Sequence, residues 1–242
     1  MVSQKTKGRE QQPFEVGLKF SFHRFRKLRL YFAWAFTIVL AIYAKSTDRG
    51  FWIAVPVVVI GEAIRMWSHG YLRKARELAT NGPYAYVRNP LYIGNYLIGL
   101  GFCLIIWHPI LGLVFTLGFF LVYWVTVRGE EQRLAFNFGD AYGDYLKNVP
   151  RFFPRLVPYK KQGNAPFAFR RAWEHGEHIT ILAIVILFML LYLRQELYQN
   201  HRPLNELSPS FLILTMGIGI SLLGVTSLRW FKNKNKMENR LS

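Results

Sequence analysis

Residues 91–127 read LYIGNYLIGLGFCLIIWHPILGLVFTLGFFLVYWVTV, which contains two apolar runs, Leu91–Trp107 and Ile110–Val127. Each run approaches the roughly 20 residues that a helix needs to cross the hydrocarbon core of a bilayer. Only His108-Pro109 separates the runs, and a proline cannot continue the preceding helix. The stretch therefore predicts a tight hairpin of two membrane-spanning helices.

Further apolar runs flank this hairpin on both sides. With the hairpin they make six runs of spanning or near-spanning length: Leu28–Ala44, Phe51–Trp67, Leu91–Trp107, Ile110–Val127, Ile179–Leu193 and Ser210–Leu228. Hydrophobic residues occupy 52% of the 242 positions, which is more than a water-soluble domain of this length ordinarily buries. We therefore predict an all-α fold, a polytopic membrane bundle of about six transmembrane helices.

The basic residues are distributed unevenly between the two sides of this predicted bundle. The side that holds both termini carries 27 Lys and Arg residues, whereas the other side carries only Lys45, Arg49, Arg194 and Arg202. Because basic residues concentrate on the cytoplasmic side of membrane proteins, both termini are expected to be cytoplasmic. The net charge of +17 lies beside apolar runs without a nucleic-acid-binding motif, so we predict a membrane partner and no nucleic acid.

Two polar stretches border the hairpin and share the predicted cytoplasmic side. The first, Gly82–Gly94, reads GPYAYVRNPLYIG and enters the third run. The second, Arg128–Pro154, reads RGEEQRLAFNFGDAYGDYLKNVPRFFP and leaves the fourth run. We expect a helix to continue out of the membrane to Phe138, followed by another helical stretch that ends before Pro150. Because the hairpin holds the two stretches close together, they are predicted to build one site.

The charged and aromatic residues of these stretches each have a structural alternative to a binding role. Arg88 alone is typical of an arginine at the headgroup boundary, and the tyrosines are typical of an interfacial aromatic belt. Glu130 and Glu131 favour a site, because carboxylates at the membrane end of a helix are costly unless they are paired or bind a cation. Pairing with Arg128 and Arg133 is the structural alternative for these carboxylates.

Two other charged groups have mainly structural interpretations. Glu62 and Arg65 lie one turn apart in the second run and are expected to form an internal ion pair. His175 and His178, beside two glutamates, have the spacing of half a metal site, but no third or fourth ligand is evident. We therefore predict no metal.

Together the two stretches resemble the isoprenylcysteine carboxyl methyltransferase and phospholipid methyltransferase superfamily of integral membrane enzymes. The first motif of that family is approximately Gly-Pro-Tyr-x-x-x-Arg-His-Pro-x-Tyr-x-Gly, which Gly82–Gly94 follows with Asn89 in place of the histidine. The second is a Glu-Glu pair and Leu, then Phe-Gly-x-x-Tyr-x-x-Tyr and Val-Pro, which Glu130–Pro150 matches. The resemblance covers about residues 61–154, and two linked motifs in the right order make it fairly specific.

The resemblance implies S-adenosylmethionine as methyl donor, a helical cofactor-binding segment on the cytoplasmic side, and a lipid or lipidated acceptor. The cofactor-binding residues that it implies are Tyr84, Tyr86, Arg88, Asn89, Pro90, Tyr92, Glu130 and Glu131. A glutamate would hold the donor's amino group or ribose, Arg88 its carboxylate, and the tyrosines its ring or sulfonium. Arg128, Arg151 and Asn89 are the candidate catalytic residues, with the arginines orienting an anionic acceptor.

Asn89 is the main departure from the family pattern. An amide donates and accepts hydrogen bonds, but it does not take up a proton as histidine does. An amine acceptor must lose a proton on methylation, whereas a carboxylate need not. The substitution therefore weakly favours a carboxylate over an amine as acceptor.

Two alternatives to a methyltransferase stay open. Sterol reductases are similar to this superfamily in part and carry a related Arg-His-x-x-Tyr-like element, which would indicate a nicotinamide-dependent membrane reductase. A membrane scaffold that has lost activity is the other alternative, with Asn89 as its sign. For the methyltransferase we divide the chain into a basic segment with the first spans (1–60), a catalytic core (61–158), and a linker with two appended helices (159–242).

Overall fold

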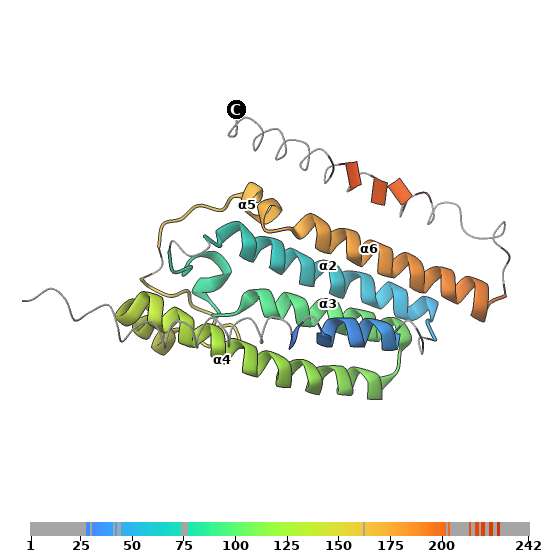
Figure 1. Cartoon of the computed structure of the whole chain (residues 1–242), viewed down its shortest axis with the longest axis horizontal. Coiled ribbons are helices and arrows are strands. Elements are labelled where there is room, and N and C mark those ends of the chain that lie inside the picture. Colours follow the sequence, from blue (N-terminus) through green and yellow to red (C-terminus); the bar gives the residue numbers. More distant parts are fainter. Residues whose placement is uncertain are drawn as a thin grey trace, which may run out of the picture.

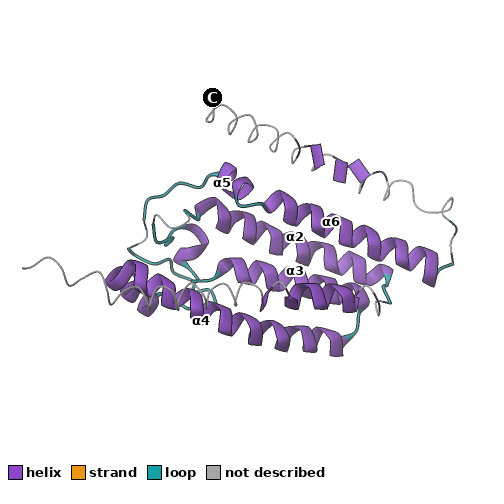
Figure 2. Cartoon of the chain, in the orientation of Figure 1, coloured by secondary structure: helices purple, strands orange, loops and turns teal. Residues whose placement is uncertain are grey.

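The computed structural model describes residues 28–29, 31–40, 42, 45–73, 77–161, 163–201, 203 and scattered positions between 213 and 227. The only regular secondary structure in these residues is helical, which confirms the all-α prediction (Figure 2). Figure 1 shows the principal helices running alongside one another. The elements are α2 (Asp48–Tyr71), a 3-10 turn η1 (Gly82–Ala85), α3 (Pro90–Ile106), α4 (Pro109–Asn148), α5 (Phe169–Glu174), α6 (Glu177–Arg194) and a π-helical turn η2 (Gln195–Gln199).

Three of the described helices are long and apolar enough to cross a membrane: Asp48–Tyr71, Pro109–Asn148 and Glu177–Gln199. Two shorter apolar helices, Tyr31–Leu40 and Pro90–Ile106, accompany them. Large side chains on these helices are exposed, Trp52 by 80% and Leu121 by 70%, and lipid solvates such surface better than water. The chain is therefore an integral membrane protein. The predicted sixth span, Ser210–Leu228, lies largely outside the described residues.

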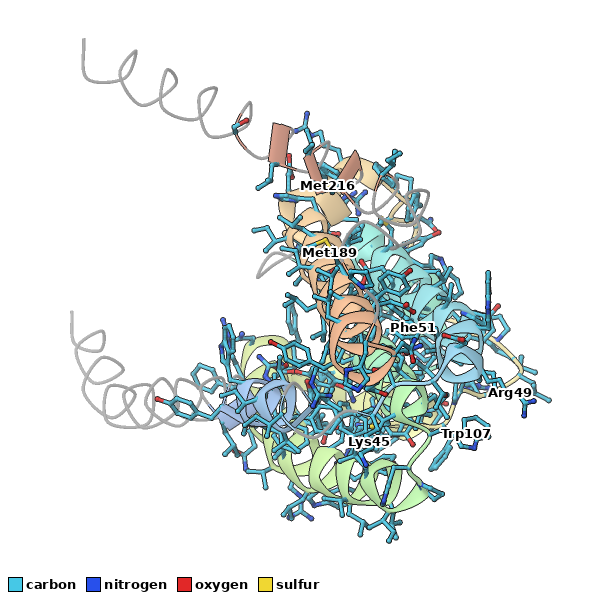
Figure 3. The ribbon with its side chains drawn as sticks, turned by 90° about the vertical axis from the view of Figure 1, so that its right-hand side faces the viewer. Lys45, Arg49, Phe51, Trp107, Met189 and Met216 are labelled. Atoms are coloured by element: carbon cyan, nitrogen blue, oxygen red, sulfur yellow. The ribbon has the colours of Figure 1, made fainter. Side chains whose placement is uncertain are left out.

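The connection between α3 and α4 has the tight form that the sequence predicts. Helix α3 ends at Ile106, and Trp107 turns the chain with a φ of 52°. Helix α4 then begins at Pro109, where a missing backbone N–H costs nothing because first-turn donors have no helical partner. Figure 3 views the bundle from this end, and Trp107, Lys45 and Arg49 are labelled there.

Glycines allow α2 and α3 to pack at close range. A Cβ on Gly94 would lie 2.6 Å from the carbonyl oxygen of Gly61, and a Cβ on Gly61 would lie 2.9 Å from that of Gly94. Larger side chains would therefore force the two backbones apart, as is common for helices that meet inside membranes. Gly94 is therefore a close-packing position between the two helices. It also fixes the start of α3 against the middle of α2.

At the end away from its connection to α3, helix α4 extends beyond α2 and α3 (Figure 1). Its helical geometry breaks at Gly139, whose φ of 48° and ψ of −125° favour glycine. This break confirms the predicted division after Phe138. The outer segment of α4 then places Tyr142, Tyr145 and Val149 in a buried cluster with Ala85 of η1. The packing brings the end of α4 to the start of α3.

Candidate functional site

Backbone hydrogen bonds join the two predicted stretches. The Arg88 amide donates to the carbonyl of Pro150 at 2.9 Å, and the Arg155 amide donates to that of Tyr86 at 3.0 Å. A third bond runs from the Tyr159 amide to the Ala85 carbonyl, also at 2.9 Å. The segment after α4 therefore lies along the segment before α3, and the structure places both stretches in one region.

The outer α4 segment contacts the first stretch through a tyrosine. Tyr145 donates its hydroxyl hydrogen to the carbonyl oxygen of Tyr84 at 2.7 Å. The Tyr84 hydroxyl itself is buried and makes no hydrogen bond within the described part of the chain. Burial raises the pKa of the Tyr84 phenol, and nearby Glu130 raises it further, so this group stays protonated. Tyr86 is only partly buried, and its carbonyl accepts the bond from Arg155.

Glu131 lies between two arginines, one from each stretch, and we call Arg88, Glu131 and Arg151 the interfacial cluster. Arg151 donates to Glu131 through Nε at 3.0 Å and through Nη2 at 2.5 Å. Arg88 Nη1 lies 3.0 Å from Glu131 Oε1, and the side chains of Arg88, Glu131 and Arg151 are 10%, 11% and 26% exposed. Charge-assisted bonds in so shielded a setting hold the three groups firmly in place.

The interfacial cluster carries more positive than negative charge. Two guanidinium groups share one carboxylate, so one positive charge is left over. Arg88 Nη1 faces Glu131, whereas Arg88 Nε is buried and makes no hydrogen bond among the described residues. Buried donors without partners are uncommon in native structures. The cluster is therefore suited to accept an anionic group such as a carboxylate.

Glu130 is held by a different set of groups. Tyr92 donates its hydroxyl hydrogen to Glu130 Oε2 at 2.5 Å, and Arg29 donates to the Tyr92 oxygen at 2.7 Å. Arg29 Nη1 also lies 3.7 Å from Glu130 Oε1. Because the Glu130 side chain is 28% exposed, it can still accept a hydrogen bond from a ligand. The two adjacent glutamates thus belong to neighbouring but distinct contact sets.

The remaining predicted residues occupy the edge of this region. Asn89 donates from Nδ2 to the carbonyl of Arg151 at 3.2 Å, which ties the start of α3 to the second stretch. Pro90 is buried as the first residue of α3. Arg128 is exposed, and its guanidinium lies 5.1 Å from the ring centre of Trp124, while that of Arg151 lies 4.9 Å from the same ring. Arg128 thus contacts Trp124 instead of the glutamates.

The structure adds partners that the sequence did not indicate. Arg29 is the second residue of the first apolar run, Leu28–Ala44, and this position is the one signal that could have placed it at a helix end. The predicted Glu62–Arg65 pair is confirmed at 3.3 Å, and Arg65 also bonds to Glu177. Glu177 therefore forms an ion pair between α6 and α2. No group of three or more His, Cys, Asp or Glu residues suited to a metal occurs in the described part of the chain.

Residues 49–141 match the phospholipid methyltransferase family. The nickel-cobalt-cadmium resistance protein NccN of Alcaligenes xylosoxydans xylosoxydans is 32% identical over 134 residues, which cover 52% of this chain and 62% of that protein. The cobalt-zinc-cadmium resistance protein CzcN of Cupriavidus metallidurans is 33% identical over 135 residues, covering 51% and 62% respectively. The protein-S-isoprenylcysteine O-methyltransferase of Schizosaccharomyces pombe is 37% identical over 81 residues, which make up 34% of each chain.

The chain thus spans less than two thirds of the length of these relatives. The predicted resemblance to the isoprenylcysteine carboxyl methyltransferase and phospholipid methyltransferase superfamily is confirmed. No solved structure matches the chain. The matched segment includes the Arg88 and Glu131 members of the interfacial cluster, whereas Arg29, Arg151 and α6 lie outside it.

Proposed function

We propose that the protein transfers a methyl group from S-adenosylmethionine to a lipid or lipidated acceptor at the cytoplasmic membrane face. The observation that carries the proposal is the interfacial cluster, whose surplus positive charge lies beside the accessible carboxylate of Glu130. The match to the phospholipid methyltransferase family supports the same activity. The distribution of Lys and Arg supports the cytoplasmic placement.

The available groups fit the donor in chemical character. Arg88 would hold the donor's carboxylate, because its Nε is a donor without a hydrogen-bond partner in the described residues. Glu130 would hold its ammonium or ribose hydroxyls, with Tyr92 and Arg29 fixing the carboxylate in position. When bound, S-adenosylmethionine supplies an electrophilic methyl group on a sulfonium.

Aromatic and small residues complete the proposed donor site. Tyr84 and Tyr86 would line the adenosine or sulfonium, since aromatic faces attract cations and stack on flat rings. Asn89 and Pro90 set the start of α3 beside these tyrosines. Shielding of the interfacial cluster from water would strengthen its electrostatic contacts with a bound molecule.

Arg128 and Arg151 would orient the acceptor. Both guanidinium groups lie over Trp124, which belongs to the apolar part of α4, so they border the lipid-facing surface. An anionic acceptor group at this boundary would be attracted to them while its hydrocarbon part stays in lipid. The Asn89 amide already donates to the Arg151 carbonyl and cannot take up a proton. This chemistry weakly favours a carboxylate acceptor over an amine.

Binding calorimetry on purified protein in lipid nanodiscs separates the candidate cofactors. We expect S-adenosylmethionine to bind and the reduced nicotinamide dinucleotide not to bind. Membranes incubated with methyl-labelled donor should then incorporate label, and its appearance in lipid, protein or small molecules identifies the acceptor class. Binding of the nicotinamide cofactor alone would support a reductase, and absence of any label transfer would support an inactive scaffold.

Variants of the interfacial cluster test the site assignment. We expect Glu131→Gln and Arg88→Ala to abolish methyl transfer while the protein stays folded, as judged by thermal unfolding. Glu174→Gln is the matched control, because Glu174 is an exposed glutamate that pairs with Arg170 within α5. Wild-type transfer rates in both cluster variants would refute the assignment.

A further inference from the structure

Glu177 is a fully buried carboxylate at the first turn of α6, outside the residues that match the family. Its two oxygens accept hydrogen bonds from Arg65 Nη2 at 2.9 and 3.1 Å. Glu62 and His69, also on α2, lie in ion-pair contact with Arg65 and Glu177 respectively. We call Glu62, Arg65, His69 and Glu177 the inner cluster. Helix α6, which lies outside the residues that match the family, thus supplies a charge to the interior of the bundle.

The inner cluster connects to the candidate site through a row of contacts. Arg65 Nη1 donates to the Asn95 side-chain carbonyl, and Asn95 Nδ2 donates to the Tyr123 hydroxyl at 3.3 Å. The Tyr123 ring then packs edge-on against Tyr92, with ring centres 4.8 Å apart. Tyr92 is the residue that donates to Glu130. The row therefore leads from α6 to the accessible carboxylate of the site.

The chemistry of the amide gives this row a direction. Asn95 has one side that accepts hydrogen bonds and one side that donates them. Because Arg65 has only donors, it selects the oxygen of Asn95 and leaves the nitrogen for Tyr123. The orientation of Arg65 thus determines which face of Asn95 meets Tyr123. Glu177 holds that orientation with two hydrogen bonds.

Joining α6 to the bundle does not by itself require a buried charge. Phe188 of α6 already packs against Phe51 of α2 and Phe102 of α3, at ring-centre distances of 6.1 and 5.0 Å. Figure 3 shows Phe51 toward the α6 side of α2. Apolar residues often stabilise a buried position as well as an ion pair does. The carboxylate therefore adds a specific geometry to contacts that apolar packing alone could supply.

We propose that Glu177 is a positioning residue for the candidate site. It orients Arg65, which fixes Asn95 and Tyr123 so that Tyr92 presents its hydroxyl to Glu130. This role rests on the proposed function and adds to it a residue from an appended helix.

Three variants in nanodiscs test the positioning role. Glu177→Gln keeps the shape of the side chain but removes its charge. Arg65→Lys keeps a positive charge but cannot hold Glu62, Glu177 and Asn95 at once, because it lacks the planar fork of arginine. The control Glu174→Gln makes the same chemical change three residues earlier, in an exposed pair. Each is compared at equal amounts of folded protein.

Methyl transfer and a spectroscopic signal provide two separate measurements. We expect Glu177→Gln and Arg65→Lys to lower kcat/KM for the donor by about tenfold to a hundredfold, as small displacements in a site do. The control should stay within about twofold, as is usual for exposed pairs. A 3-fluorotyrosine placed at position 123 should shift its ¹⁹F resonance in both test variants but not in the control.

The outcomes separate this inference from the proposed function. Unchanged kcat/KM and an unchanged ¹⁹F resonance in an active protein would overturn the positioning role alone. A wild type that neither binds nor uses the donor would overturn the proposed function, while the resonance would still test the row of contacts. A lower unfolding temperature with normal kinetics and an unshifted resonance would make Glu177 purely structural, which also overturns the inference.

Discussion

The interfacial cluster and the inner cluster use the same kinds of side chain in opposite proportions. At the interface, Arg88 and Arg151 surround one carboxylate, and Arg151 is 26% exposed. Inside the bundle, Glu62 and Glu177 surround Arg65, whose side chain is 13% exposed, and His69 completes the set. Surplus charge with an open edge suits the binding of a ligand. A set of side chains that contact one another and are each at most 13% exposed suits the fixing of geometry.

The largest effect on stability should come from Arg65→Ala. Removing the guanidinium leaves two buried carboxylates without their shared partner, which costs about 3–5 kcal/mol for comparable buried pairs. Chemical unfolding in detergent measures this loss. Arg170→Ala is the control, since the Arg170 side chain is 88% exposed and its pair with Glu174 should contribute little. Equal losses of stability in the two variants would contradict the description of the inner cluster as buried ion pairs.

Arg88→Ala should affect function more than it affects stability. Glu131 keeps both bonds from Arg151 in this variant, so we expect a loss of only about 1–2 kcal/mol. Donor binding should nevertheless disappear from calorimetric titrations. A variant that unfolds as readily as Arg65→Ala would show that the interfacial cluster is mainly structural.

Tyr92→Phe should have an intermediate effect, because Tyr92 lies in the row of contacts between the inner cluster and Glu130. The variant loses the hydroxyl between Arg29 and Glu130 but keeps the ring against Tyr123. The loss of one such hydrogen bond corresponds to about tenfold weaker donor binding. Tyr31→Phe removes a hydroxyl from a ring that is 66% exposed and should leave the affinity unchanged.

The smallest effect concerns alkaline pH and Tyr159. Burial, together with the hydrogen bond to Asp144, raises the pKa of Tyr159 to about 12. The neutral phenol therefore stabilises the fold below its usual pKa of about 10, and this contribution is lost as pH rises toward 12. The free energy of unfolding, measured from pH 8 to 11, should fall less steeply with pH in Tyr159→Phe than in the wild type. Tyr198→Phe, at a 76% exposed position, should keep the wild-type slope.

The sequence predicted the parts of the fold that depend on neighbouring residues. His108-Pro109 indicated the hairpin, and the spacing of Glu62 and Arg65 indicated their ion pair. It could not distinguish Arg88 and Arg151 from Arg128 as partners of Glu131, since that choice depends on how the second stretch folds back. In the sequence, Glu177 is noticeable only as a neighbour of His178. Its partner Arg65 could not be predicted, because their contact exists only after α6 docks on α2.

The separation of Arg65 and Glu177 by 112 residues has a consequence for the order in which the protein is made. Helix α2 must enter the membrane before the ribosome has synthesised the carboxylate that later accepts two bonds from Arg65. Glu62, one turn earlier and 3.3 Å from Arg65 Nε, is available from the start and can neutralise the arginine during insertion. We expect Glu62 to neutralise Arg65 during insertion, until α6 brings Glu177 to it.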